Sequence, residues 1–377
     1  MNLNEYLEEG LFSLNTKRSV RIIFCIIPNI YGVKEDLMDL HESDTDLTVI
    51  SLFCGCGGLD WGFKDAGFKV IWANDFNLHA VNSYQENFPD TLVIYKNIKD
   101  ISIDEIPDAD ILIGGFPCQG FSLGGCRRKN DPRNTLYLEF SRILQGKRPK
   151  VFLAENVKGL LTMGGGSVIN DIVEDFKKSG YNIYYRFYNA KQFGVPQDRE
   201  RVFLVGIRDD LEINFKFPEP TFGPGTEQTY NTMRKEIWEL RDNPGDIIKA
   251  SFSSRYMSRQ RKRGWDKVSY CIPASAKQVP LHPDGEKMQK KCKDLWVFQG
   301  DLNRRLSITE CKVIQSFPKE FILKGPLQSQ YNQIGNAVPP RLAAALAISI
   351  KKALLSNVDI LEIQIPEYPT VNSTNRL

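Results

Sequence analysis

The sequence of 377 residues is poor in histidine and contains no paired cysteine motif. Its three histidines (His41, His79 and His282) lie far apart, and none of its eight cysteines forms a Cys-x-x-Cys pair. Zinc sites are built from such clusters, so we expect no metal site. Cysteines spread through a long chain with no secretory leader also favour a reduced compartment over a disulfide framework.

Long apolar runs are absent as well. The stretch Ile22 to Tyr31 is interrupted by Pro28 and is shorter than the roughly 20 residues of a membrane helix. An acidic segment precedes it and no small-residue cleavage site follows, which argues against a signal peptide. The net charge is only +3, so total charge selects no class of partner. We expect a soluble, cytoplasmic protein.

From Leu47 onward, short apolar segments alternate with amphipathic ones. This alternation predicts an α/β fold with a doubly wound, mostly parallel sheet. The predicted strands are 48–53, 70–73, 92–95, 111–113, 151–154 and 201–207. The predicted helices are 59–66, 79–87, 135–145, 168–179 and 341–355.

Composition divides the chain into five parts. Residues 1–46 form an extension of unknown role, and 47–214 form a first domain that carries most of the alternating strands and helices. Residues 215–300 are rich in Pro, Gly, Lys and Arg, without a sustained helical period, and indicate a smaller, irregular domain. Residues 251–300 contain eleven basic and only four acidic residues, so this stretch carries a local excess of positive charge. Residues 301–360 return to the first domain, and 361–377 are a tail.

Gly114 to Ser122 is the most informative stretch. It places Pro117 and Cys118 among glycines directly after the strand 111–113. Open α/β folds carry their chemistry at this edge, and a cysteine there can attack as a thiolate if its pKa is lowered. Taken alone, the motif also fits a small buried hydrophobic residue.

Other motifs stand at neighbouring strand ends. The glycine-rich loop Phe53 to Gly58 joins a strand to a helix, and Asp75 ends the next strand, where it is placed to bind ribose hydroxyls. Glu155 follows the strand 151–154 and is a candidate acid or hydrogen-bond partner. Arg199 and Arg201 alternate into a strand and therefore share a face. Singly, these features also fit a tight turn, a capping glutamate and surface ion pairs.

Together, the ordered motifs resemble those of the DNA (cytosine-5)-methyltransferase family, bacterial restriction-modification type. They are Phe-x-Gly-x-Gly-Gly, Pro-Cys-Gln, Glu-Asn-Val, Gln-x-Arg-x-Arg and Gln-Ile-Gly-Asn-Ala-Val-Pro, the last at 333–339. The resemblance covers residues 47–355. It implies methyl transfer from S-adenosyl-L-methionine, giving S-adenosyl-L-homocysteine, to C5 of a flipped-out cytosine in a short duplex DNA sequence.

The resemblance also implies roles for particular residues. Cys118 would be the nucleophile, forming a covalent adduct at cytosine C6, with Glu155, Arg199 and Arg201 as catalytic partners. The implied cofactor-binding residues are Phe53, Gly55, Gly57, Gly58, Leu59, Asp75, Asn97, Ile98, Pro117, Leu136, Asn336 and Ala337. The DNA-binding residues would be Gln119, Ser122, Arg127, Arg128, Arg259, Arg261 and Arg263.

Residues 215–300 occupy the family's target-recognition region. Ser258 to Trp265 is its densest basic cluster, and arginine pairs bidentately with guanine. The region is similar to those of relatives that modify short G/C-rich sites such as GGCC or sites with a GCGC core, so we expect a G/C-rich palindrome. The loop Leu123 to Lys129 could close over DNA, or it is an ordinary solvated loop.

Three positions depart from the family pattern. Asn97 stands where an aspartate usually binds the adenine amino group, but its amide oxygen still accepts that hydrogen bond. We therefore expect weaker cofactor affinity rather than its loss. Asn134 replaces a common glycine, and Asp75 replaces the more frequent, longer glutamate.

The resemblance further implies a monomer, without a membrane partner, that acts on nucleoid DNA in the bacterial cytosol. It would protect host DNA from a partner restriction endonuclease without forming a stable complex. Two rivals stay open, namely a tRNA cytosine-5 methyltransferase and a non-catalytic DNA-binding regulator. A nucleotide-dependent oxidoreductase explains neither Pro-Cys-Gln nor the basic region.

Overall fold

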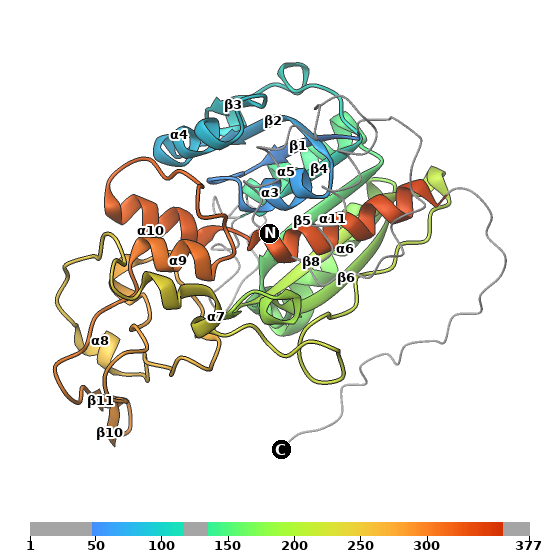
Figure 1. Cartoon of the computed structure of the whole chain (residues 1–377). Helices are drawn as coiled ribbons and strands as arrows, with labels where there is room; N and C mark the ends of the chain where they lie inside the picture. Colours follow the sequence, from blue (N-terminus) through green and yellow to red (C-terminus); the bar gives the residue numbers. More distant parts are fainter. Residues whose placement is uncertain (1–46, 117–134, 357–377) are drawn as a thin grey trace, which may run out of the picture.

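The computed structural model describes residues 47–116 and 135–356. A seven-stranded sheet in the order β3-β2-β1-β4-β5-β8-β6 forms its centre (Figure 1). The strands are β1 (Thr48–Leu52), β2 (Lys69–Asp75), β3 (Leu92–Tyr95), β4 (Ile111–Gly114), β5 (Val151–Val157), β6 (Tyr181–Asn189) and β8 (Glu200–Arg208). The five strands from β3 to β5 run parallel, whereas β8 is antiparallel to both β5 and β6. The predicted doubly wound, mostly parallel sheet is confirmed.

The last two strands are arranged in a way that the sequence analysis did not predict. Strand β6 was not identified, although its nine residues are rich in tyrosine and phenylalanine, which favour strands. Strand β8 lies between β5 and β6 rather than following β5 in parallel. Because β8 is reversed, its first residues lie at the carboxyl edge of β5, where Val157 pairs with Arg201.

Helices cover both faces of the sheet. On one face α3 (Gly58–Asp65) and α11 (Pro340–Leu355) pack on alternate residues of the strands. On the other face lie α5 (Thr135–Lys147) and α6 (Ser167–Lys178). Helix α4 (Leu78–Asn87) follows β2. The central parallel strands β1, β4 and β5 are buried on both sides, which explains their predominantly apolar sequences, whereas the edge strand β3 is partly exposed.

Between β8 and α9 the chain forms a smaller region with short elements, which are α7 (Met233–Ile237), α8 (Ser254–Met257), β9 (Ser269–Tyr270), β10 (Gln289–Cys292) and β11 (Leu295–Val297). The two-residue strand β7 (Gln197–Asp198) precedes β8, and α9 (Ile308–Ile314) and α10 (Leu327–Asn336) lead from the smaller region to α11. In Figure 1, α9 and α10 lie between the sheet and the α8 and β10–β11 parts. The pairing of β7 with β9 joins this region to the carboxyl edge of the sheet.

No helix in the described ranges 47–116 and 135–356 is long and apolar enough to cross a membrane.

The contact between α3 and α11 depends on a glycine. A Cβ atom at Gly62 would overlap the Cβ of Ala343 and lie 2.5 Å from the backbone nitrogen of Ala344. We expect Gly62→Ala to lower the free energy of unfolding by about 1–3 kcal/mol, because the helix backbones must move apart. Urea unfolding measures this loss. Gly159→Ala is the control, since its Cβ would meet nothing closer than 3.6 Å, and an equal loss in both variants would contradict the packing argument.

Candidate active site

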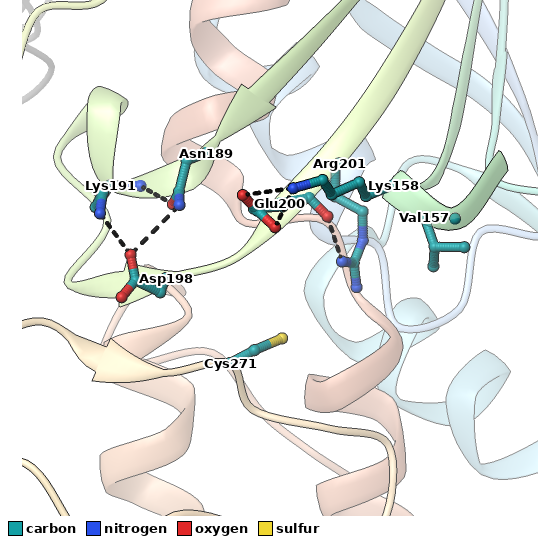
Figure 2. A pocket seen from close by; sticks show the side chains of 9 residues that line it. Val157, Lys158, Asn189, Lys191, Asp198, Glu200, Arg201 and Cys271 are labelled. Atoms are coloured by element: carbon teal, nitrogen blue, oxygen red, sulfur yellow. Dashed lines mark hydrogen bonds and ion pairs between the residues drawn. The ribbon is translucent and has the colours of Figure 1, made fainter. Parts of the chain in front are cut away.

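A cleft of about 590 Å³ opens at the carboxyl edge of the sheet. Its walls come from the ends of β5, β6 and β8 and from the smaller region. The lining residues are Val157, Lys158, Gly159, Asn189, Lys191, Asp198, Glu200, Arg201 and Cys271. Figure 2 shows the exposed thiol of Cys271 on one side of this cleft, across from Arg201 and Glu200. Ligands of open α/β sheets bind in this position.

Glu155 and Arg201 form an ion pair beside the cleft. Glu155 sits on β5 and exposes only 9% of its surface. Arg201 Nε donates to Glu155 Oε1 at 2.8 Å, and its Nη1 donates to the carbonyl of Glu200 at 2.7 Å. The guanidinium therefore holds Oε1 of the Glu155 carboxylate in place. Because the carboxylate is rigid, the direction of Oε2 is fixed as well.

The second oxygen of Glu155 faces the chain that leads to Cys118. A Cβ atom at Gly115 would lie 3.0 Å from Glu155 Oε2, so a larger residue there would press on this carboxylate. The next residue on β5, Asn156, donates from Nδ2 to the carbonyl of Phe116 at 3.0 Å. The structure thus holds Glu155 against the last described residues before Pro117. The sequence analysis missed this role of Asn156, although its place in Glu-Asn-Val was a signal.

Arg199 does not join the Glu155 pair. Its side chain is 1% exposed, and its guanidinium donates to three carbonyls at 2.8–3.1 Å: those of Ile272, Gly335 and Ala337. Burial lowers the pKa of Arg199 to about 10, so the side chain stays charged at neutral pH. Arg199 and Arg201 lie two residues apart, but Arg201 reaches Glu155 beside the cleft, whereas Arg199 reaches the junction with the smaller region.

The glycine-rich loop lies between β1 and α3. Phe53 has a positive φ of 55°, and Gly55 and Gly57 have φ values of 56° and 92°. A positive φ in a residue other than glycine stores strain, which gathers at ligand sites. Nothing lies within 4 Å of a Cβ placed on Gly55, so the backbone there is open to a ligand. The N-terminus of α3, with Leu59 as its second residue, follows this loop.

Asp75 ties the glycine-rich loop to the end of β2. Its Oδ2 accepts from the amide of Gly55 at 2.9 Å and its Oδ1 accepts from Asn77 at 2.8 Å. Burial raises the pKa of Asp75, and the two amides partly offset this. Each oxygen keeps a second lone pair for a ligand hydroxyl. Its neighbour Phe76 exposes 65% of its surface, which the sequence analysis did not single out.

The segment after α10 closes this loop from the other side. A Cβ atom at Gly58 would lie 3.0 Å from the Cβ of Ala337 and would overlap the carbonyl of Val338. Asn336 is exposed. The structure therefore brings the predicted cofactor residues at 53–59, Asp75 and 336–337 together, although about 280 positions separate the first from the last.

The remaining predicted cofactor residues are placed on two other elements. Asn97 is exposed and accepts from the amide of Lys99 at 3.2 Å, and Ile98 is buried in the core. Leu136 lies in the first turn of α5. Pro117, Cys118, Gln119, Ser122, Arg127, Arg128 and Asn134 lie outside the described residues.

Comparison with known proteins decides the family. The family model for C-5 cytosine-specific DNA methylases matches residues 47–352. The chain belongs to this family. It is 42% identical to the Type II methyltransferase M.BsuRI of Bacillus subtilis, over 92% of this chain and 90% of that protein. It is 43% identical to M.BspRI of Lysinibacillus sphaericus, over 82% of each chain.

The solved structures agree on the fold. A variant of Spodoptera frugiperda DNMT2 superposes with a TM-score of 0.61 at 21% identity, covering 81% of this chain and 99% of that one. The Dnmt2 methyltransferase of S. pombe gives 0.60 at 18% identity, covering 82% and 99%. The protein is thus a DNA (cytosine-5)-methyltransferase with the fold of S-adenosylmethionine-dependent enzymes, as the motifs predicted.

The predicted DNA-reading arginines of the methyltransferase differ in their surroundings. Arg259 is exposed. Arg261 is half-buried over the ring of Tyr256 and donates to Gln278 Oε1 at 2.9 Å. Arg263 pairs with Asp198 on the cleft wall, and its guanidinium lies 3.9 Å from the ring centre of Tyr270. Of the three, Arg259 presents its side chain most openly, whereas the other two already hold partners within the protein.

Beneath the glycine-rich loop of the methyltransferase lies Asp60, which is fully buried and accepts from the Tyr84 hydroxyl at 2.9 Å. Burial raises the pKa of Asp60 from 3.8 to about 6, although hydrogen bonds partly offset this. The folded protein thus binds this proton more tightly than the unfolded chain. The associated stability is present in full below pH 3.8 and is lost as the pH rises through about 6.

Asp60→Asn should remove this dependence. Between pH 4.5 and 7.5 we expect the variant to gain about 2 kcal/mol in unfolding free energy relative to the wild type. Urea unfolding at both pH values measures it. Asp108→Asn serves as the control because the Asp108 side chain is 87% exposed. Parallel pH profiles for Asp60→Asn and wild type would refute the assignment.

Proposed function

We propose that the protein is a Type II modification methyltransferase that methylates C5 of a flipped-out cytosine within a short, specific duplex DNA sequence. The observation that carries the proposal is the Glu155–Arg201 pair, which lies beside the cleft and against the chain leading to Cys118. The identity with Type II methyltransferases over most of the chain supports the biological class.

The residues around the glycine-rich loop fit S-adenosylmethionine. Gly55 leaves room for the close approach of a ligand to the backbone, and Asp75 offers lone pairs to ribose hydroxyls. The exposed ring of Phe76 would cover an adenine face, and Asn97 and Ile98 on the loop after β3 would contact the same base. Gly57, Gly58, Asn336 and Ala337 would enclose the methionine portion, with Phe53, Leu59, Pro117 and Leu136 around it. When bound, the cofactor supplies an electrophilic methyl group.

Cys118 is proposed to attack cytosine C6 as a thiolate. The new S–C6 bond would make C5 enamine-like, so that C5 would take the methyl group and S-adenosylhomocysteine would be released. A base would then remove the C5 proton as the S–C6 bond breaks and the thiolate leaves. Electron density moves onto N3 during attack, and Glu155 is placed to hold a proton there. Arg201 keeps Glu155 oriented and adds positive potential, whereas Arg199 supports the site from the junction.

DNA would bind across the cleft between the sheet and the smaller region. The target base must leave the duplex stack, at a cost of a few kcal/mol. We assign recognition to residues 215–300, with Arg259, Arg261 and Arg263 in its basic cluster and a G/C-rich palindrome as target. Residues 47–214 and 301–360 would form the catalytic domain. The enzyme would act as a cytoplasmic monomer and protect DNA from a separate restriction endonuclease.

Methyl transfer tests the proposal directly. Labelled S-adenosylmethionine is incubated with duplex DNA and the purified protein, and modified cytosines are mapped by sequencing. We expect labelling confined to one short sequence and lost in Cys118→Ala. Labelling of tRNA but of no duplex would overturn the DNA assignment, and duplex binding without transfer to either would indicate a non-catalytic regulator.

A further inference from the structure

Two buried glutamine side chains connect the cleft region with the cofactor region. Gln197 on β7 and Gln315 after α9 are both 0% exposed, and Gln197 Nε2 donates to Gln315 Oε1. Neither residue lines the cleft, and neither takes part in the proposed chemistry. Removing two amide groups from water is costly unless they form hydrogen bonds, and both of these amides are hydrogen-bonded through their nitrogen and oxygen atoms. We therefore asked what this buried pair does.

The Gln197 end holds the smaller region. Gln197 Oε1 accepts from the backbone amide of Ile272 at 2.8 Å, next to Cys271 in the cleft wall. β7, which carries Gln197, also pairs in parallel with β9. If DNA binding displaced the Cys271 segment, the hydrogen bond between the Ile272 amide and Gln197 Oε1 would therefore be stretched or broken.

The Gln315 end holds the segment that encloses the glycine-rich loop. Gln315 Nε2 donates to the carbonyls of Ile334 at 3.0 Å and Ala337 at 2.7 Å. Ala337 in turn stands against Gly58 at the start of α3. The two ends approach each other directly as well, because a Cβ atom at Gly335 would overlap the carbonyl of Pro273.

The chemistry of the amide group makes the two ends of this connection depend on each other. Each amide donates through its nitrogen and accepts through its oxygen, so rotation of one side chain breaks bonds at both of its ends. Buried groups that lose a partner cost roughly 1–3 kcal/mol each, and no solvent reaches these to replace it. Together with Arg199, which donates to the carbonyls of both Ile272 and Ala337, the glutamine pair therefore holds these two segments in a fixed relative position.

We infer that Gln197 and Gln315 are positioning residues that couple cofactor binding to target binding. The inference rests on the proposed function, which places the cofactor beside Ala337 and DNA beside Cys271. Linkage is reciprocal, so bound cofactor tightens DNA binding by the same factor by which DNA tightens cofactor binding. Couplings of this kind amount to about 5- to 150-fold.

The test measures this factor rather than activity. S-adenosylhomocysteine is titrated into wild type and Gln315→Met by calorimetry, with and without a saturating duplex that contains the mapped target sequence. We expect the duplex to lower the dissociation constant at least about fivefold in the wild type and less than twofold in the variant. Binding of each ligand alone should change less than about threefold, since neither glutamine contacts a ligand.

Gln333→Met is the matched control. Gln333 is a buried glutamine in α10, away from the junction. Its Oε1 accepts from the Ser83 hydroxyl, and its Nε2 donates to the Ser329 hydroxyl and to the carbonyl of Lys324. It should keep the full coupling at comparable loss of stability. If Gln315→Met does not fold, Gln197→Met tests the same pair from its other end.

The outcomes separate the two claims. A wild type that binds neither ligand contradicts the proposed function. A wild type that binds both without coupling overturns the inference alone, and so does undiminished coupling in Gln315→Met or its loss in Gln333→Met.

Discussion

Glu155→Gln should lower the rate of methyl transfer by about 10²–10⁴-fold while S-adenosylhomocysteine and duplex still bind. Glutamine keeps the shape of the side chain and an oxygen for Arg201 Nε, which lies 2.8 Å from Glu155 Oε1. It cannot hold and release a proton at the second oxygen. Single-turnover methyl transfer, with both ligands saturating, isolates this step from binding.

The matched control lines the same cleft. Glu200→Gln removes a carboxylate paired with Lys158 at 3.1 Å, and this pair is partly exposed to solvent. Surface pairs contribute little, so we expect the rate to change less than about threefold. The catalytic role of Glu155 would be refuted if both variants kept more than a third of the wild-type rate.

Arg199→Leu is expected to give the largest loss of stability, at least about 3 kcal/mol in the free energy of unfolding. The substitution removes the guanidinium donor from the buried carbonyls of Ile272 and Gly335 and one of the two side-chain donors of Ala337, and each buried group left without a partner costs roughly 1–3 kcal/mol. Urea unfolding followed by tryptophan fluorescence and by circular dichroism measures the loss.

Arg208→Leu, at the far end of the strand that begins directly after Arg199, provides the comparison. Arg208 pairs with the exposed Asp210 at 2.6 Å near the molecular surface. Its removal should cost about 1 kcal/mol or less. Equal losses in the two variants would mean that the junction does not depend on the Arg199 guanidinium.

The sequence predicted the parallel half of the sheet because burial on both faces leaves a plain signature. The segment 111–113 is a continuous apolar run followed by Gly114, and 48–53 is apolar except for Thr48 and Ser51 and leads into the glycine-rich loop. Strand β6 was missed because it lies at the sheet edge, where polar and aromatic residues alternate. The reversed insertion of β8 is a matter of topology that no local pattern in Glu200–Arg208 encodes.

The candidate site also contains residues whose positions were predicted from the sequence and residues whose positions were not. The motifs around Gly55, Asp75 and Glu155 were visible because strand ends of a parallel sheet meet at one edge. The different destinations of Arg199 and Arg201 were not, because alternation along a strand ignores what packs against each side chain. Only the tertiary arrangement brings the carbonyls of 335–337 to Arg199. For the same reason, the internal partners of Arg261 and Arg263 could not be predicted.

The packing of α3 against α11 has a consequence for the newly made protein. Gly62 lies against Ala343, about 280 residues later in the chain. At about 5–20 residues per second, a ribosome needs tens of seconds to make that intervening stretch. During this time the side of α3 that packs against α11 has no native cover, so the glycine-rich loop cannot reach its final form before synthesis is nearly complete. Methylating capacity in a growing cell therefore trails translation, and a chain cut short before α11 should contribute none.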